Sequence, residues 1–156
     1  MKNKGFSLVE LIIVIAIMAI LAAAIAPALI RYIDKSRRSD DVAAAETLNT
    51  ATQAAFANED AYDEVQSAIA SASSDGTALA TATQGGTFSM ITGSAPTFLE
   101  EVNSSCGNKA PSLKYKKNGA SKWAIGANSA GKPVVWVYGS TLTSVQLQPS
   151  IDKTYK

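Results

Sequence analysis

Two adjoining stretches decide the fold: Lys4-Gly-Phe-Ser-Leu-Val-Glu10, and the uncharged run from Leu11 to Ile30 that follows it. As a helix, this run is about 30 Å long, which matches the hydrocarbon thickness of a bilayer. Glu10 lies at the start of this apolar stretch, and a charge near the membrane centre costs about 3 kcal/mol or more. The sequence therefore predicts a membrane-spanning helix with a carboxylate that needs a partner or a role.

Two common kinds of apolar segment are alternatives, an ordinary single-pass anchor and a secretory signal peptide. The apolar region of a signal peptide is about 7–15 residues long, and this run is longer. A small-x-small cleavage pattern occurs at Ala22–Ala24 and again at Ala24–Ala26, where the second site would place Pro27 directly after the cut. Neither alternative gives Glu10 a role.

The order Lys-Gly-Phe-Ser-Leu-Val-Glu-Leu resembles the class III signal of the type IV pilins, which fixes residue types on both sides of a cleavage point. The resemblance implies that residues 1–5 are a leader, that a prepilin peptidase cuts between Gly5 and Phe6, and that the new amine of Phe6 is methylated. Gly5 suits such a site because it has no side chain. Lys2 and Lys4 favour a cytoplasmic leader.

The same resemblance implies that Glu10 pairs with the Phe6 amine of a neighbouring subunit during assembly. A buried carboxylate that faces a buried ammonium removes two desolvation penalties, and only one register satisfies both groups. Pro27 lacks a backbone N–H and clashes with the preceding turn, so a kink in the helix is expected there.

The helix is expected to continue well beyond the apolar run, because no glycine occurs between Gly5 and Gly76. We expect one helix from about Phe6 to about Ala57, and a second helix to about Ala72 that Asn58 or Asp60 caps. Apolar residues recur on one face, which should pack on a globular domain: Val42, Ala45, Leu48, Thr52, Ala55, Phe56 and Tyr62. The opposite, polar side carries Lys35, Arg38, Asp41, Glu46 and Gln53.

Strand signals dominate the last third of the chain, whereas the Ser- and Thr-rich stretch 71–86 is expected to be irregular. Thr97–Glu100 has capping-box spacing and predicts a short helical turn. The expected strands are Leu113–Lys116, Lys122–Ala127, Val134–Tyr138 and Leu142–Gln148, with hairpin turns at Asn118-Gly119 and Gly139-Ser140.

These elements predict an α+β fold in which a long N-terminal helix, half transmembrane and half amphipathic, packs on a C-terminal antiparallel sheet of three or four strands. This arrangement is the pilin fold that the resemblance implies. The expected division of the chain is a leader (1–5), a membrane and filament-core helix (6–30), an amphipathic helical region (31–72) and a β-rich head (73–156).

The composition offers little chemistry. There is no histidine, which excludes the triads and the zinc patterns that need one. Acidic residues at 59–64 and 100–101 have no calcium-loop spacing and indicate solvated helix surface. Cys106 is the single cysteine, so no disulfide can form within the chain, and its role is a small buried residue or an intermolecular or reactive thiol. We therefore expect no enzyme, no metal and no cofactor.

Positive charge gathers near the expected hairpin at Lys114, Lys116, Lys117 and Lys122. The simplest interpretation is that these lysines protect solvated strand edges. A second hypothesis is contact with the acidic helical region of a neighbouring subunit. A third, with Tyr115 and Trp123 nearby, is binding of DNA or anionic surfaces.

The resemblance implies a structural subunit of a type IV pilus, a major pilin for adhesion, motility or related functions. It would be a single-pass precursor in the cytoplasmic membrane and an extracellular homo-oligomeric filament after assembly. The implied partners are the prepilin peptidase, the assembly ATPase and the membrane platform protein. One alternative is a pseudopilin of a type II secretion or DNA-uptake system, which shares the leader. Another is a secreted binding module with an ordinary signal peptide.

Overall fold

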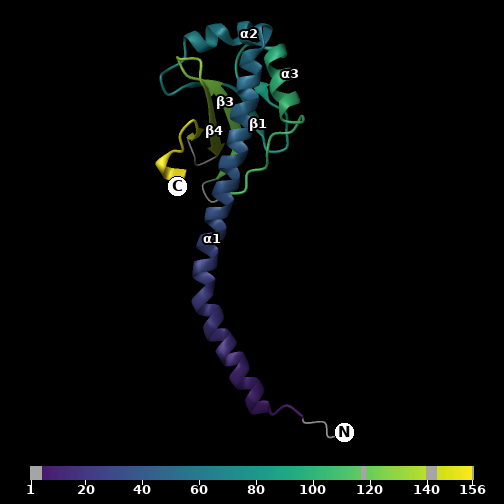
Figure 1. The fold of residues 1–156 in the computed structure, drawn as a ribbon, viewed down its shortest axis with the longest axis vertical. Coiled ribbons are helices and arrows are strands. Elements are labelled where there is room, and N and C mark those ends of the chain that lie inside the picture. The colour runs from purple at the N-terminus through teal and green to yellow at the C-terminus, as the bar shows by residue number, and fades with distance from the viewer. Residues whose placement is uncertain (1–4, 117–118, 140–143, 156) are drawn as a thin grey trace. The chain divides into compact units, whose positions relative to one another are not determined.

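The computed structural model describes residues 5–116, 119–139 and 144–155. The chain divides into two compact units, Met1–Ser36 and Arg37–Lys156. Helix α1 (Leu8–Ala57) runs through both of them, as the sequence predicts (Figure 1). The second unit is a head in which the later part of α1 joins two further helices and a sheet.

The head contains one antiparallel sheet with the strand order β2-β1-β3-β4-β5. This confirms the expected α+β, pilin-like arrangement, but the described residues form five strands in this sheet rather than three or four. The elements after α1 are α2 (Glu59–Ala70), β1 (Thr77–Thr83), β2 (Ser89–Met90), α3 (Pro96–Ser105), β3 (Ala120–Ala127), β4 (Pro133–Gly139), β5 (Val145–Gln148) and the 3₁₀ turn η1 (Lys153–Tyr155).

Strand β1 corrects the expectation of an irregular segment at 71–86. It pairs with both β2 and β3 and so lies inside the sheet. Its sequence Thr-Ala-Leu-Ala-Thr-Ala-Thr buries Leu79, Ala80 and Ala82. The small alanines make the hydrophobic signal of this strand weak, although its threonines favour extended backbone.

The expected hairpin partner of β3 is wrong. Residues 113–116 form no strand, and β3 pairs with β1 and β4 instead. The alternation that suggested a strand is real, because Leu113 and Tyr115 are buried while Lys114 and Lys116 are exposed. The backbone N–H groups of Lys114 and Tyr115, however, donate to the side chain of Asp41. The Asp41 carboxylate thus accepts the backbone hydrogen bonds that a neighbouring strand would accept in a sheet.

Two predicted turns are not fully covered by the structure. Lys117 and Asn118 lie outside the described residues, as do Ser140 and the start of the expected strand at Leu142. The described part of that strand, β5, pairs with β4 as expected. The turn between β3 and β4 is fully described, and in it the Asn128 side chain accepts the N–H groups of Ala130 and Lys132.

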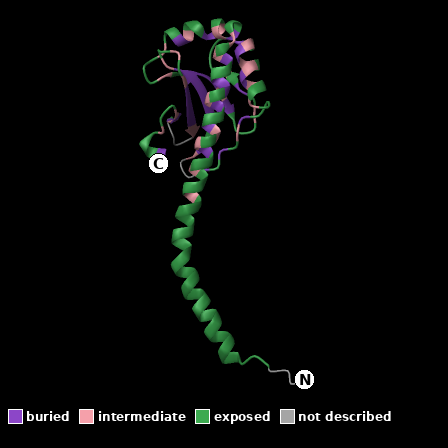
Figure 2. Cartoon of the chain, viewed as in Figure 1, coloured by how far each residue is buried: buried purple, intermediate pink, exposed green. Residues whose placement is uncertain are grey.

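The main core lies between the helices and one face of the sheet, where buried residues gather in Figure 2. Trp123, Ile125, Val135 and Val137 point into it from β3 and β4. Alternate residues of these strands form a smaller cluster on the other face, around Ala124, Val134 and Trp136. This alternation is what the period of two in a strand requires.

The buried face of α1 is largely the predicted one, with one correction. Ala45, Leu48, Thr52 and Ala55 are buried. Asp41, expected on the polar side, is fully buried. The reason is that three hydrogen-bond donors of the head meet its carboxylate, which offsets the cost of burying the charge.

Helix caps join the three helices. Asn58 caps α2, as one of the two expected alternatives, and its amide also donates to Glu101. No side chain at the start of α3 caps that helix. Glu64 of α2 does so instead, because its carboxylate accepts the N–H groups of Thr97 and Phe98 and the Thr97 hydroxyl. The predicted turn at 97–100 is therefore helical, but its cap comes from another helix.

We expect Gly126→Ala to destabilise the head by about 3 kcal/mol. A Cβ at this position would lie 1.9 Å from the carbonyl oxygen of Thr77, which is backbone of the paired strand and cannot turn away. Gly93→Ala is the control. It has a φ of +75° but nothing within 4 Å of its Cβ, so it should cost only about 1 kcal/mol. Equal losses in chemical denaturation would contradict the close approach.

A second prediction concerns pH. Burial would raise the pKa of Glu64, but hydrogen bonds from Phe98 and Thr97 lower it below its usual value. The folded state therefore releases this proton more easily, so the contribution of Glu64 is complete above about pH 4.5 and is lost as the pH falls. The melting temperature of Glu64→Gln should lie below that of the parent at pH 7, and the gap should narrow towards pH 3. Asp63→Asn, on the exposed side of α2, should leave it unchanged at pH 7.

Candidate processing and assembly segment

The first turn of α1 is closed by a reciprocal pair of side chains. The Glu10 carboxylate accepts the Ser7 backbone N–H through Oε2 at 2.9 Å. The Ser7 hydroxyl accepts the Val9 N–H at 3.3 Å, and the Ser7 carbonyl accepts the Leu11 N–H at 3.2 Å. This is a capping box in which Ser7 is the N-cap and Glu10 the third helical residue. The carboxylate is also favourably placed at the positive end of the helix dipole.

The expected cleavage point lies just outside this cap. Gly5 and Phe6 precede the helix in irregular backbone. The Phe6 side chain is 82% exposed, and, apart from the neighbouring residues of the chain, no described atom lies within 4 Å of the position that a Cβ would take at Gly5. Within the described chain, the peptide bond between Gly5 and Phe6 is therefore open to an enzyme.

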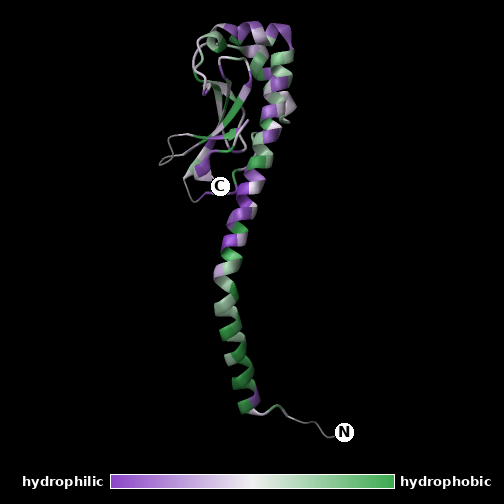
Figure 3. Ribbon diagram, turned by 60° about the vertical axis from the view of Figure 1, so that its left-hand side comes forward, coloured by the Kyte–Doolittle hydropathy of each residue, from purple (hydrophilic) through white to green (hydrophobic). Residues whose placement is uncertain are grey.

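The apolar part of α1 finds no cover within its own unit. Every described residue from Gly5 to Ile33 is exposed, including large side chains such as Ile20 and Met18 (Figure 2). Figure 3 shows the same stretch as the most hydrophobic part of the helix. By length and composition, α1 can cross a membrane. The helix is continuous through Pro27, so the kink expected at this residue stays a prediction.

The Glu10 carboxylate is bonded to the amide of Ser7, the residue directly after Phe6, and Pro27 lies more than four helical turns further along α1. The role of Ser7 was not predicted from the sequence. The spacing Ser7-x-x-Glu10 is the ordinary signature of a capping box and could have revealed it. The charge of Glu10 is the more conspicuous signal, and it masks the local function of this side chain.

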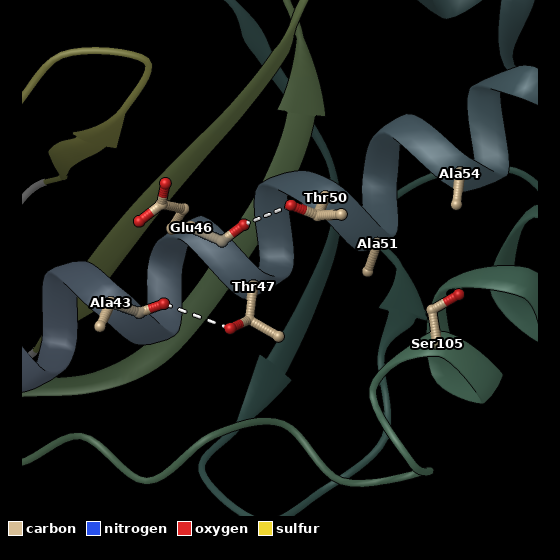
Figure 4. A pocket seen from close by; sticks show the side chains of 7 residues that line it. All are labelled: Ala43, Glu46, Thr47, Thr50, Ala51, Ala54 and Ser105. Carbon is tan, nitrogen blue, oxygen red and sulfur yellow. Dashed lines mark hydrogen bonds between the residues drawn. The ribbon is translucent and has the colours of Figure 1, made fainter.

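A shallow groove of about 430 Å³ lies on the head, between α1 and the end of α3 (Figure 4). It is lined by Ala43, Glu46, Thr47, Thr50, Ala51, Ala54 and Ser105. The hydroxyl groups of Thr47 and Thr50 donate to the carbonyl oxygens of Ala43 and Glu46 in the preceding turn. The donor hydrogens of both hydroxyls are thus used within the helix, and the groove presents methyl groups beside the polar side chains of Glu46 and Ser105.

The other side chains that the sequence singled out, a thiol and two aromatic rings, are partly or fully buried in the head. Cys106 is half-buried at the end of α3 against the core, and burial raises the pKa of its thiol. A raised pKa lowers the thiolate fraction and hence the reactivity. The rings of Tyr115 and Trp123 are buried, so neither can stack on a nucleic-acid base. Among the described residues, no cluster of three His, Cys, Asp or Glu side chains could hold a metal ion.

Comparisons with known proteins find relatives of the N-terminal segment. Residues 1–26 match the family model described as the prokaryotic N-terminal methylation motif. The type IV major pilin protein PilA of Myxococcus xanthus (strain DK1622) is 37% identical over 68 residues, which are 44% of this chain. That match spans 31% of the length of PilA. No solved structure gives a significant match. The methylation motif and the PilA match together support the recognition of this chain as a type IV pilin.

Proposed function

We propose that this chain is a major pilin, the structural subunit of a type IV pilus, and that it acts by assembly rather than by catalysis. The observation that carries the proposal is the N-terminal segment. An apolar stretch of exposed side chains begins with a single carboxylate, Glu10, which is bonded to the amide of Ser7, the residue directly after Phe6. The match of residues 1–26 to the methylation motif supports the same conclusion.

Processing is the first step of the proposal. A prepilin peptidase removes residues 1–5 at the Gly5–Phe6 bond, and the Phe6 amine is methylated. The absence of a side chain at Gly5 and the exposure of Phe6 support access to this bond. The capping box keeps the helix start at Ser7 independent of the leader, because none of its bonds involves a residue before Ser7.

Assembly is the second step. Before it, residues 6–30 anchor the precursor in the cytoplasmic membrane as a single span, with residues 31–72 and 73–156 outside. An assembly ATPase and a membrane platform protein then move subunits into an extracellular filament. The exposed side chains of residues 6–30 exchange lipid for neighbouring helices, which the small residues of this stretch favour. Pro27 would kink the helix where it packs.

Glu10 sets the register in this scheme. The Phe6 amine of one subunit pairs with the Glu10 carboxylate of its neighbour. Since Oε2 already accepts the Ser7 N–H within the chain, we expect Oε1 to receive the amine. Two buried opposite charges are satisfied in one relative position only, so the pair specifies alignment more than it adds stability.

The first test is the N-terminal residue and the intact mass of the mature protein from its native cell. A start at methylated Phe6 is expected. A start near Ile25 or Pro27 would show ordinary secretion and would contradict the proposal. Replacement of Gly5 by a bulky residue should leave the leader attached and prevent filament formation.

The second test separates the charge of Glu10 from its capping role. Glu10→Gln keeps a side-chain oxygen for the Ser7 N–H but removes the charge, and we expect it to abolish filaments in electron microscopy. Ser7→Ala is the matched control, because it removes the cap hydroxyl and keeps the carboxylate. Helix capping of this kind is worth about 1 kcal/mol, so the control should still form filaments.

The outcomes of this pair are distinct. Normal filaments from Glu10→Gln would remove the assembly role, and equal loss from both variants would reduce Glu10 to a helix cap. Correct processing without long surface fibres in the parent strain would favour the pseudopilin alternative.

A further inference from the structure

The head contains a buried carboxylate that the assembly scheme does not use. Asp41 of α1 is fully buried. Its Oδ1 accepts the backbone N–H of Lys114 at 2.7 Å, and its Oδ2 accepts that of Tyr115 at 2.9 Å. Oδ2 also accepts the Tyr155 hydroxyl at 2.6 Å. One residue of α1 thus holds two segments that are far apart in the sequence.

Tyr155 is the C-terminal end of this contact. Its side chain is 1% exposed and packs edge-on against the Tyr115 ring, with centroids 5.7 Å apart. Burial, and then the hydrogen bond and charge of Asp41, raise the pKa of Tyr155 far above its usual value. The hydroxyl therefore stays protonated and remains a donor to Asp41.

Arg38 completes the arrangement from the preceding turn of α1. Its guanidinium carbon lies 4.6 Å from the centroid of the Tyr115 ring, and one of its NH₂ groups donates to the Tyr115 hydroxyl at 3.2 Å. Tyr115 is thereby held by its backbone to Asp41 and by its ring to Arg38. Cation–π and charge-assisted contacts of this kind are strengthened where water is excluded.

Among the described residues, few hydrogen bonds tie residues 149–155 to the sheet, and one of them is donated by the Gln146 side-chain amide to the Ser150 hydroxyl. Beyond the end of β5, the Asp152 N–H donates to the Gln146 carbonyl, and Asp152 caps the 3₁₀ turn through Thr154. Ile151 packs against the core, and Tyr155 belongs to it. Since the sequence has a single cysteine, no internal disulfide can secure this segment.

We propose that Asp41 and Tyr155 form a latch that holds residues 149–155 closed over the core of the head, and that the head opens first at this point. Release of the latch uncovers the core around Tyr155 and Ile151 while the sheet stays paired, because none of the strand ladders depends on Asp41.

The test compares Tyr155→Phe and Asp41→Asn with the parent in the full chain, kept in detergent. Tyr155→Phe deletes one hydroxyl and keeps the ring. We expect backbone amides of 151–155 to exchange hydrogen about tenfold faster, as the loss of one buried, charge-assisted hydrogen bond predicts. Carboxypeptidase should trim the C-terminus faster by a similar factor, while amides of β3 and β4 keep their protection.

The matched control is Tyr138→Phe. Tyr138 also hydrogen-bonds through its hydroxyl, to Ser144, but belongs to the cluster on the other face of the sheet. Trimming of this variant should match the parent. Unchanged trimming of Tyr155→Phe, or exchange that rises equally in β3 and β4, would overturn the latch. Asp41→Asn places an amide where three donors converge. It should therefore accelerate amide exchange and trimming more than Tyr155→Phe does. If it fails to fold, Tyr155→Phe decides the question alone.

Discussion

The structure depends on one constraint, which is that a single helix must serve two different environments. The first part of α1 exposes every apolar side chain from Leu8 to Ile33, so it needs lipid or neighbouring helices as cover. The second part buries one face against its own sheet. The helix continues through Pro27 without a break. The two parts of α1 therefore differ in residue composition and not in backbone conformation. Under the proposed function, lipid would supply this cover before assembly and neighbouring helices would supply it in the filament.

The sequence predicted the elements of the head better than their connections. Helix length followed from the lack of glycine, and β3, β4 and β5 followed from their apolar runs. Strand β1 was missed because alanine and threonine give a weak signal. Alternation at Leu113 and Tyr115 was real, but alternation does not say whether a strand or the side chain of Asp41 accepts the backbone hydrogen bonds. Residue type alone could not place Asp41 inside the core.

The candidate site was predictable to a different degree. Gly5, Phe6 and Glu10 were identified by their order, and the structure adds that Glu10 is already bound to the Ser7 amide. That addition was readable from a spacing of three residues. The cap that Glu64 provides for α3 was not, because its donors at Thr97 and Phe98 lie more than 30 residues away. Local chemistry can be read from sequence, whereas chemistry between elements requires the fold.

The threonines of the groove show that a polar residue type can expose mainly apolar atoms. Hydropathy treats Thr47 and Thr50 as polar, yet both hydroxyl hydrogens are already donated to the turn before them. A surface that contacts this groove would displace water from methyl groups without breaking a hydrogen bond of the helix. Association there should carry the negative heat-capacity change of apolar burial, while Glu46 and Ser105 offer polar contacts at the same groove.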